Sequence, residues 1–244
     1  MKKFLALLLT LGLLGSVSPV LAAENGQLSS LPAWSHEQIA DGYAMGLFGN
    51  EIYTDYNKVI TQEQLADLTK TVADKLAVLN MPANPSKGET LVIDTTRGGV
   101  LNALYQEAAA YNFPNVNSDP VEYMASLGAV CGNGRSLMLD RPCTLLEASI
   151  FANRLILALY DGQNAGSLGL LWKATGNGNT LYLLGSIHTD RSNLYPFHKQ
   201  LRDIIASTEL AAFELDFNSQ EGIDEFAAMQ VYSDGTTLKD HISS

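Results

Sequence analysis

The N-terminal part of the chain repeats one pattern of helix signals about 82 residues apart. In each copy a short apolar segment stops at a glycine, Gly46 or Gly128, and a longer helix is expected after the loop that follows. Thr61 and Thr144 stand at the starts of these longer helices, each followed three residues later by a glutamine or a glutamate. That arrangement is the capping box of a helix N-terminus. The pattern therefore predicts repeated helical modules.

Apolar residues after both threonines recur at helical spacing, which predicts one amphipathic helix in each copy. Between the two copies, Thr96 marks a third, degenerate helix start. An earlier helix is expected to begin with Ser35 as N-cap, with Trp34 packed on Ile39, and to end at Gly46. The apolar series are Leu65, Leu68, Val72, Leu76 and Leu79 in the first copy, and Ile150, Phe151, Leu155 and Leu159 in the second.

This pattern resembles the S-layer homology module, a helix-loop-helix unit whose second helix starts with a Thr-Arg-x-Glu-like motif. The three helix starts are Thr-Gln-Glu-Gln at 61–64, Thr-Arg-Gly-Gly at 96–99 and Thr-Leu-Leu-Glu at 144–147. The resemblance implies an S-layer-homology-like helical module over residues 24–163, of the kind that in sets of three can bind cell-wall polymer. The alternative is a helical packing domain in which the threonines are only caps.

Residues 1–22 have the composition of a secretory signal peptide. The chain starts Met-Lys-Lys, continues with apolar residues from Phe4 to Leu14 and reaches an A-x-A-like cleavage site at Val20-Leu21-Ala22. We expect cleavage after about Ala22, because the apolar stretch is short for a bilayer span. A retained N-terminal anchor is the alternative. In either case the rest of the chain is expected to be exported, as a secreted or cell-envelope-associated protein.

The acidic charge balance excludes two classes of partner. The formal net charge is −11, and loss of residues 1–22 removes two lysines and leaves 13 basic against 26 acidic residues, a charge of −13. Nucleic acids and anionic membrane surfaces both require a basic footprint. We therefore expect a soluble chain that binds no nucleic acid.

The chain has two cysteines, Cys131 and Cys143. In an oxidising compartment, a lone pair so close in sequence predicts a disulfide. The alternative is two reduced thiols. A structural zinc site needs more ligands than this pair supplies.

A different pattern begins after residues 164–167, Asn-Ala-Gly-Ser, which have the composition of a short flexible linker. Two strand-like runs at 168–174 and 181–184 flank a Gly- and Asn-rich turn and predict a β-hairpin. A helix at about 197–206 and a strand at 210–216 follow. A strand-helix-strand succession favours a right-handed crossover, so we expect the beginning of an α/β domain with a mixed or parallel sheet.

Polar side chains close two of these apolar runs. His188 ends the Gly-Ser-Ile-His sequence that starts at Gly185, and Glu214 and Asp216 end the last strand. Open α/β sheets form their sites beyond the carboxyl ends of strands, so His188 and Glu214 are expected at one edge. Imidazole and carboxylate suit a divalent ion such as Mn, Co or Zn, which lowers the pKa of bound water. Without metal, His188 would be a general base oriented by Glu214.

These residues resemble the start of the TraB/GumN family, which includes the TIKI metalloproteases. The family combines two Gly-x-x-His motifs and a glutamate on an α/β fold related to erythromycin esterase and to a haem-binding lipoprotein. The resemblance implies that Gly185 and His188 form the first motif, that His188 and Glu214 are catalytic residues and metal ligands, and that Asp216 supports them. It also implies a peptide or ester substrate. The resemblance rests on Leu-Trp-Lys at 171–173, on residues 179–188, on Leu-Tyr-Pro at 194–196 and on residues 213–216.

The chain departs from the family pattern in its second half. No second Gly-x-x-His sequence occurs, since His241 lacks the glycine, and residues 168–244 are few for a complete α/β core. We therefore expect the N-terminal part of a longer domain. The leading hypothesis is an exported, metal-dependent, peptidase-like hydrolase. The alternative is a cell-envelope protein that binds wall polymer through its helices and has an inactive C-terminal domain. No haem is expected, because no haem-ligand pattern is present.

Overall fold

A computed structural model describes residues 6–7, 30–85, 93–132, 134–185 and 194–212, and within 221–241 the residues 221–222, 224, 228, 232, 234–236 and 238–241. The chain forms two compact units. The helical unit comprises Gln27–Leu168 and Asp190–Asp203, and the sheet unit comprises Met1–Gly26, Gly169–Thr189 and Ile204–Ser244. Residues 190–203 thus group with the helices, although their sequence pattern continues that of the C-terminal part. None of the described helices has the length and apolar character of a membrane span.

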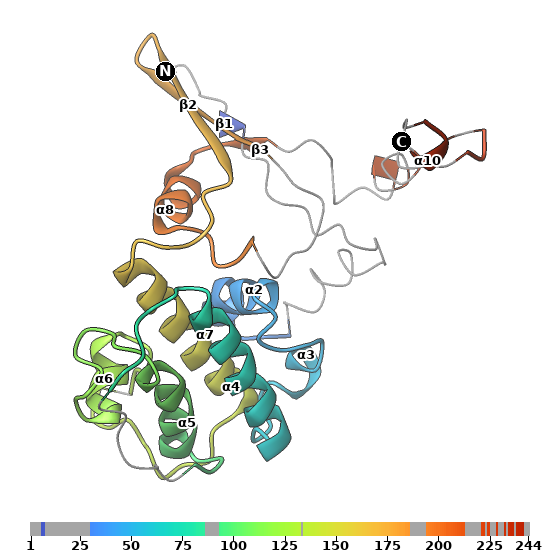
Figure 1. The fold of residues 1–244 in the computed structure, drawn as a ribbon. Helices are drawn as coiled ribbons and strands as arrows, with labels where there is room; N and C mark the ends of the chain where they lie inside the picture. Colours follow the sequence, from blue (N-terminus) through green and yellow to red (C-terminus); the bar gives the residue numbers. More distant parts are fainter. Residues whose placement is uncertain are drawn as a thin grey trace. The chain divides into compact units, whose positions relative to one another are not determined.

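The predicted helical N-terminal part is confirmed (Figure 1). The three longest helices of this unit, α4, α5 and α7, pack against one another, and α2 packs on α7. Their contact surfaces form one hydrophobic core, to which both predicted apolar series contribute. The elements are η1 (Ala33–Ser35), α2 (His36–Ala44), α3 (Ile52–Asp55), α4 (Gln62–Ala77), α5 (Arg97–Ala109), α6 (Pro120–Ser126), α7 (Leu145–Gly162) and the start of α8 (Lys199–Ser207).

The three long helices begin at the predicted threonines. The Thr61 backbone N–H donates to Gln64 Oε1 at 3.0 Å, and the Gln64 N–H donates to Thr61 Oγ1 at 3.1 Å, which completes a capping box. Thr144 forms the same box with Glu147. Thr96 accepts only from the Gly99 N–H, at 3.1 Å, because glycine has no side chain to return the bond. The third helix start therefore has only one of the two hydrogen bonds of a capping box, the one that the cap side chain accepts.

The two predicted glycine stops are confirmed by their backbone geometry. Gly46 has φ +76° and Gly128 has φ +68°, in the left-handed region that glycine occupies without a steric penalty. After each glycine, the next residue donates back to the last turn, from Leu47 N to Gly42 O and from Ala129 N to Met124 O. These are Schellman endings, so α2 and α6 stop at equivalent points of the repeat.

The helix α2 begins directly after Ser35, as expected, but the predicted capping by the Ser35 side chain is corrected. Ser35 lies in a 3-10 turn that leads into α2, and its hydroxyl donates to Pro32 O at 2.7 Å instead of capping the helix. The 3-10 turn gives Ser35 a helical backbone, whereas a capping serine needs an extended one. Trp34 is 61% exposed while Ile39 is fully buried, and the predicted packing of one on the other stays a prediction.

The loops before the three threonines are joined by backbone hydrogen bonds. Ile60 N donates to Cys143 O at 3.0 Å, and Cys143 N donates to Thr95 O at 2.8 Å. Short antiparallel bridges pair Val59 with Thr144 and Thr96 with Pro142. The N-termini of α4, α5 and α7 therefore meet at one junction.

The sheet unit contains the predicted β-hairpin, formed by β2 (Leu170–Gly176) and β3 (Asn179–Gly185) in antiparallel register. Its two-residue turn has φ +54° at Asn177 and +78° at Gly178, as a type I′ turn requires. The two-residue strand β1 (Ala6–Leu7) pairs in parallel with β3 and with β4 (Ala211–Ala212). These pairs are too short to establish a parallel or mixed sheet, which stays a prediction. A short helix, α10 (Leu238–His241), follows.

Candidate functional site

The first predicted motif starts where β3 ends. Gly185 is the last residue of β3 and pairs with Leu170 of β2. A Cβ at Gly185 would lie 3.1 Å from Leu170 Cβ, so glycine permits the close approach of the two strands. The strand predicted before the His188 motif is therefore present and ends at Gly185. His188, Glu214 and Asp216 lie outside the described residues.

β3 is the more buried strand of the hairpin. Leu184 is 1% exposed, whereas Leu170 and Trp172 of β2 are 62% and 54% exposed. On β2 and β3, Lys173 Nζ lies 5.8 Å from the centroid of the Tyr182 ring, a cation–π contact. The strand that precedes the His188 motif is therefore the more buried of the two.

A metal centre is not formed by the described residues alone. They contain no group of three or more His, Cys, Asp and Glu side chains placed to hold a metal ion. The chemistry of the predicted donors, an imidazole at His188 and a carboxylate at Glu214, suits a divalent cation. The metal and its ligands stay predictions.

His241 lies in an arrangement that the sequence reasoning missed. Asp234 Oδ1 accepts from the Thr236 N–H at 3.0 Å and from the Thr236 hydroxyl at 2.5 Å, and these bonds hold the pKa of Asp234 below its usual value. Thr236 Oγ1 is 2.6 Å from His241 Nε2, and Tyr232 stacks on the imidazole. All four side chains are at or near the surface. The Asp-Gly-Thr sequence could have predicted the turn but not its contact with His241.

The predicted disulfide is corrected, because Cys131 and Cys143 are both free thiols. Cys143 is buried between the joined loops before α7, and its Sγ contacts Thr144 O at 3.6 Å. Cys131 is exposed, and its Sγ accepts from Arg154 Nη1 at 3.5 Å. Although the two cysteines are close in sequence, Cys143 lies in the interior and Cys131 lies at the surface beside Arg154.

Arg97 is the one arginine of the three Thr-Arg-x-Glu-like helix starts, and its charge is used inside the helical unit. The guanidinium is 3% exposed. It donates to Glu147 Oε1 at 2.7 Å, to Leu137 O at 2.9 Å and to Cys131 O at 3.2 Å, and lies 4.9 Å from the centroid of the Phe151 ring. Arg97 is thus a structural residue and does not face a ligand.

A groove of about 340 Å³ lies in the helical unit between the α2–α3 loop, the first turns of α4 and the start of α7. Its polar lining includes the carboxylates of Glu51 and Asp67, the Gln64 amide and the Thr71 hydroxyl, and Phe48 supplies an aromatic ring. No basic side chain is among the described residues that line it. Such a lining suits a neutral or cationic ligand and disfavours an anionic one.

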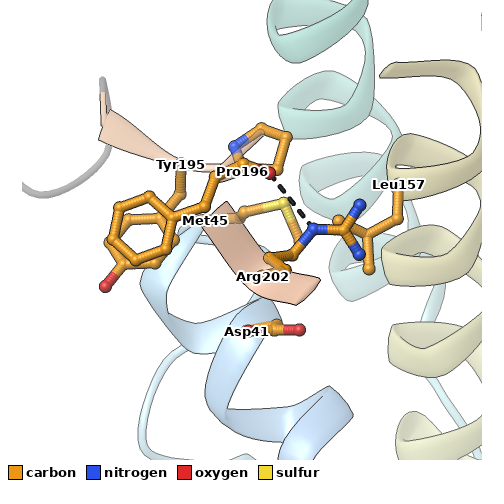
Figure 2. A pocket seen from close by; sticks show the side chains of 7 residues that line it. Asp41, Met45, Leu157, Tyr195, Pro196 and Arg202 are labelled. Carbon is orange, nitrogen blue, oxygen red and sulfur yellow. Dashed lines mark hydrogen bonds between the residues drawn. The ribbon is translucent and has the colours of Figure 1, made fainter. Parts of the chain in front are cut away.

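A second, much smaller cavity of about 10 Å³ lies where residues 195–202 meet α2 and α7 (Figure 2). Asp41, Met45 and Leu157 face Pro196 and Arg202 across it. Burial raises the pKa of Asp41 to about 6, the nearby Glu37 carboxylate adds to the rise, and the Arg202 guanidinium opposes it. The volume admits no ligand larger than one water molecule, so the cavity marks a packed contact.

Residues 170–244 match the model of the TraB/PrgY/gumN family, which confirms the resemblance expected for this part of the chain. No curated protein and no solved structure matches the chain. The S-layer homology resemblance of the helical part stays a prediction. The C-terminal residues 170–244 are therefore similar to the TraB/PrgY/gumN family.

Proposed function

We propose that the chain is an exported, metal-dependent hydrolase that cleaves peptide or ester bonds. The family match over residues 170–244 carries this proposal, because it spans both Gly185–His188 and Glu214. The position of Gly185 at the end of strand β3 supports the proposal, because α/β sheets place their functional side chains beyond strand ends.

In this proposal His188 and Glu214 bind a Mn, Co or Zn ion, and Asp216 orients them. A bound divalent ion would supply a water of lowered pKa for attack on a carbonyl carbon. Glu214, when not a ligand, would accept the proton of that water. The signal peptide at residues 1–22 would deliver the protein outside the cytoplasm.

The test compares His188→Ala and Glu214→Gln with His36→Ala. His36 is a suitable control because its Nε2 contacts Leu31 O at 3.0 Å, in a helical turn far in sequence from the motif. Bound Mn²⁺ is measured by calorimetry, and hydrolysis by cleavage of fluorogenic peptides and esters. Both site variants should weaken Mn²⁺ binding by at least about tenfold and abolish hydrolysis, while the control behaves as wild type. Unchanged binding and hydrolysis in both site variants would refute the proposal.

A second candidate function, binding of a cell-envelope polymer, is supported by the groove at the first turns of α4 and α7. Because Glu51 and Asp67 line it, we propose an uncharged or cationic saccharide as its ligand. Cell wall purified with and without its anionic polymer should both retain the protein. Asp67→Ala should weaken retention, whereas Asp74→Ala, an exposed acid farther along α4, should not. Loss of retention on removal of the anionic polymer would contradict this candidate.

A further inference from the structure

Residues 164–167, predicted as a flexible linker, are ordered by backbone contacts. Asn164 ends α7 in the left-handed conformation, with φ +51°. Its N–H donates to Asp161 O at 3.0 Å, and Ala165 N donates to Tyr160 O at 2.9 Å. Ala165 also packs against the helical core. The chain therefore leaves α7 in one fixed direction.

The same residues pair with the segment after Tyr195. Ser167 N donates to Pro196 O at 3.1 Å, and His198 N donates to Ser167 O at 3.0 Å, which forms a parallel bridge. Gly166 has φ +110°, and a Cβ there would lie 2.7 Å from His198 N. A side chain at position 166 would therefore collide with backbone that cannot move away without breaking the bridge.

Polar contacts from two helices hold the segment at further points. Lys75, at the C-terminal end of α4 and 9% exposed, donates from Nζ to Tyr195 O at 3.0 Å. Arg202 forms an ion pair with Asp161 of α7 and donates from Nε to Phe197 O at 3.1 Å. These bonds use charged donors, which contribute more than neutral ones.

Apolar packing completes the attachment. Tyr195 packs against the helical core and stacks on Phe197, with ring centroids 4.4 Å apart. Around the small cavity of Figure 2, Pro196 faces Met45 of α2 and Leu157 of α7. Helices α2, α4 and α7 thus each contribute to one continuous contact with residues 195–202.

The contact with the helices involves residues that lie between the two parts of the predicted site in the sequence. Residues 194–203 follow the Gly185–His188 motif and precede β4 and Glu214, and they lie within the family match. We propose that the helical unit is a positioning element for the family-matched residues, in which Lys75, Asp161 and Gly166 hold the segment that lies in sequence between the His188 motif and Glu214. This inference goes beyond the proposed hydrolase function and is tested without an activity assay.

The test measures amide hydrogen exchange by mass spectrometry on the full chain. Lys75→Met removes the bond to Tyr195 O, and Lys70→Met, the same change at an exposed site on α4, is the control. Peptides covering 194–203 should exchange at least about tenfold faster in Lys75→Met, and the loosening should extend to β3. Wild-type exchange of 194–203, or loosening that leaves β3 unchanged, would overturn the proposal.

Further variants at Gly166, Asp161 and Arg202 separate positioning from general loss of structure. Gly166→Ala should reproduce the loosening, and if it does not fold, Lys75→Met carries the test. Asp161→Arg and Arg202→Asp should each loosen 194–203. The double variant regains an ion pair but not the bond from position 202 to Phe197 O, so it should restore exchange in 194–203 and β3 part of the way to wild type. Faster exchange in the double variant than in either single variant would refute the role of this pair.

Discussion

Arg97 and Glu147 form an ion pair of 2.7 Å between the first turns of α5 and α7. Glu147 is also the capping-box residue that accepts from the Thr144 N–H, and it forms a second ion pair with Arg141. One carboxylate therefore links two helix starts and the loop before α7. The buried guanidinium in turn satisfies two loop carbonyls. This pair therefore ties the starts of α5 and α7 together at the junction.

Arg97→Met should destabilise the helical unit by about 3 kcal/mol, because it leaves two loop carbonyls without their guanidinium donor and removes one of the two ion pairs of Glu147. The free energy of unfolding is measured by urea denaturation followed by circular dichroism. Lys70→Met, which removes an exposed basic side chain on α4, is the control and should change stability by less than about 0.5 kcal/mol. Equal, small effects for the two variants would contradict the role assigned to Arg97.

The same junction predicts a loss of stability in acid. Burial opposes ionisation of Glu147, but the Thr144 N–H and the Arg141 and Arg97 guanidinium groups outweigh it and hold its pKa below the usual value. A lowered folded-state pKa adds stability above the unfolded-state value of 4.5, and this stability is lost as pH falls through the folded-state pKa.

Between about pH 6 and about pH 3, the wild type should therefore lose more unfolding free energy than Glu147→Gln. The measurement is urea denaturation across this range. Parallel curves for the two proteins would show that Glu147 has its usual pKa.

The helix starts show which parts of the fold the sequence could predict. The capping boxes at Thr61 and Thr144 and the turn at Asn177 depend on neighbours within three residues, so local chemistry determines them. The expected cap at Ser35 was wrong because Pro32 starts a 3-10 turn that the spacing of polar residues does not reveal.

Contacts between residues distant in sequence were beyond local reasoning. Arg97 belongs to a repeated helix-start motif, but its partners lie 34 to 50 residues away. The hydrogen bond from Lys75 to Tyr195 O joins residues 120 positions apart, so no local sequence pattern could predict it. For the candidate site, strand periodicity predicted β3 up to Gly185, and the family resemblance supplied the roles of His188 and Glu214.

The two thiols should differ strongly in reactivity. Burial, together with the nearby Glu147 charge, raises the pKa of Cys143 to about 12 despite the opposing arginines. Cys131 is exposed. With a chromogenic disulfide reagent at neutral pH, the native protein should release about one equivalent of thiolate rapidly and the second only after unfolding. Cys131→Ser should abolish the rapid phase. A native protein with no reactive thiol before reduction would instead indicate a disulfide.

The raised pKa of Asp41 makes its contribution to folding stability depend on pH in the opposite direction from that of Glu147. Its folded-state pKa of about 6 exceeds the unfolded-state value of 3.8, so its contribution to stability is fully present below the lower value and is lost as pH rises through the higher one. Asp41→Asn removes this loss while keeping the shape of the side chain. At about pH 7 the variant should be more stable than wild type by about 2 kcal/mol, allowing for partial solvent screening.

The stability gain of Asp41→Asn should nearly disappear at about pH 3.5, because Asp41 is then protonated in the folded wild type and is as neutral as the amide of the variant. Glu37→Gln removes the neighbouring negative charge that adds to the rise, so it should lower the Asp41 pKa and reduce the gain. Urea denaturation at several pH values gives both quantities. The ion pair of Arg202 with Asp161 should persist in both variants, because it uses a different carboxylate. A gain independent of pH would mean that amide packing, and not ionisation, stabilises the variant.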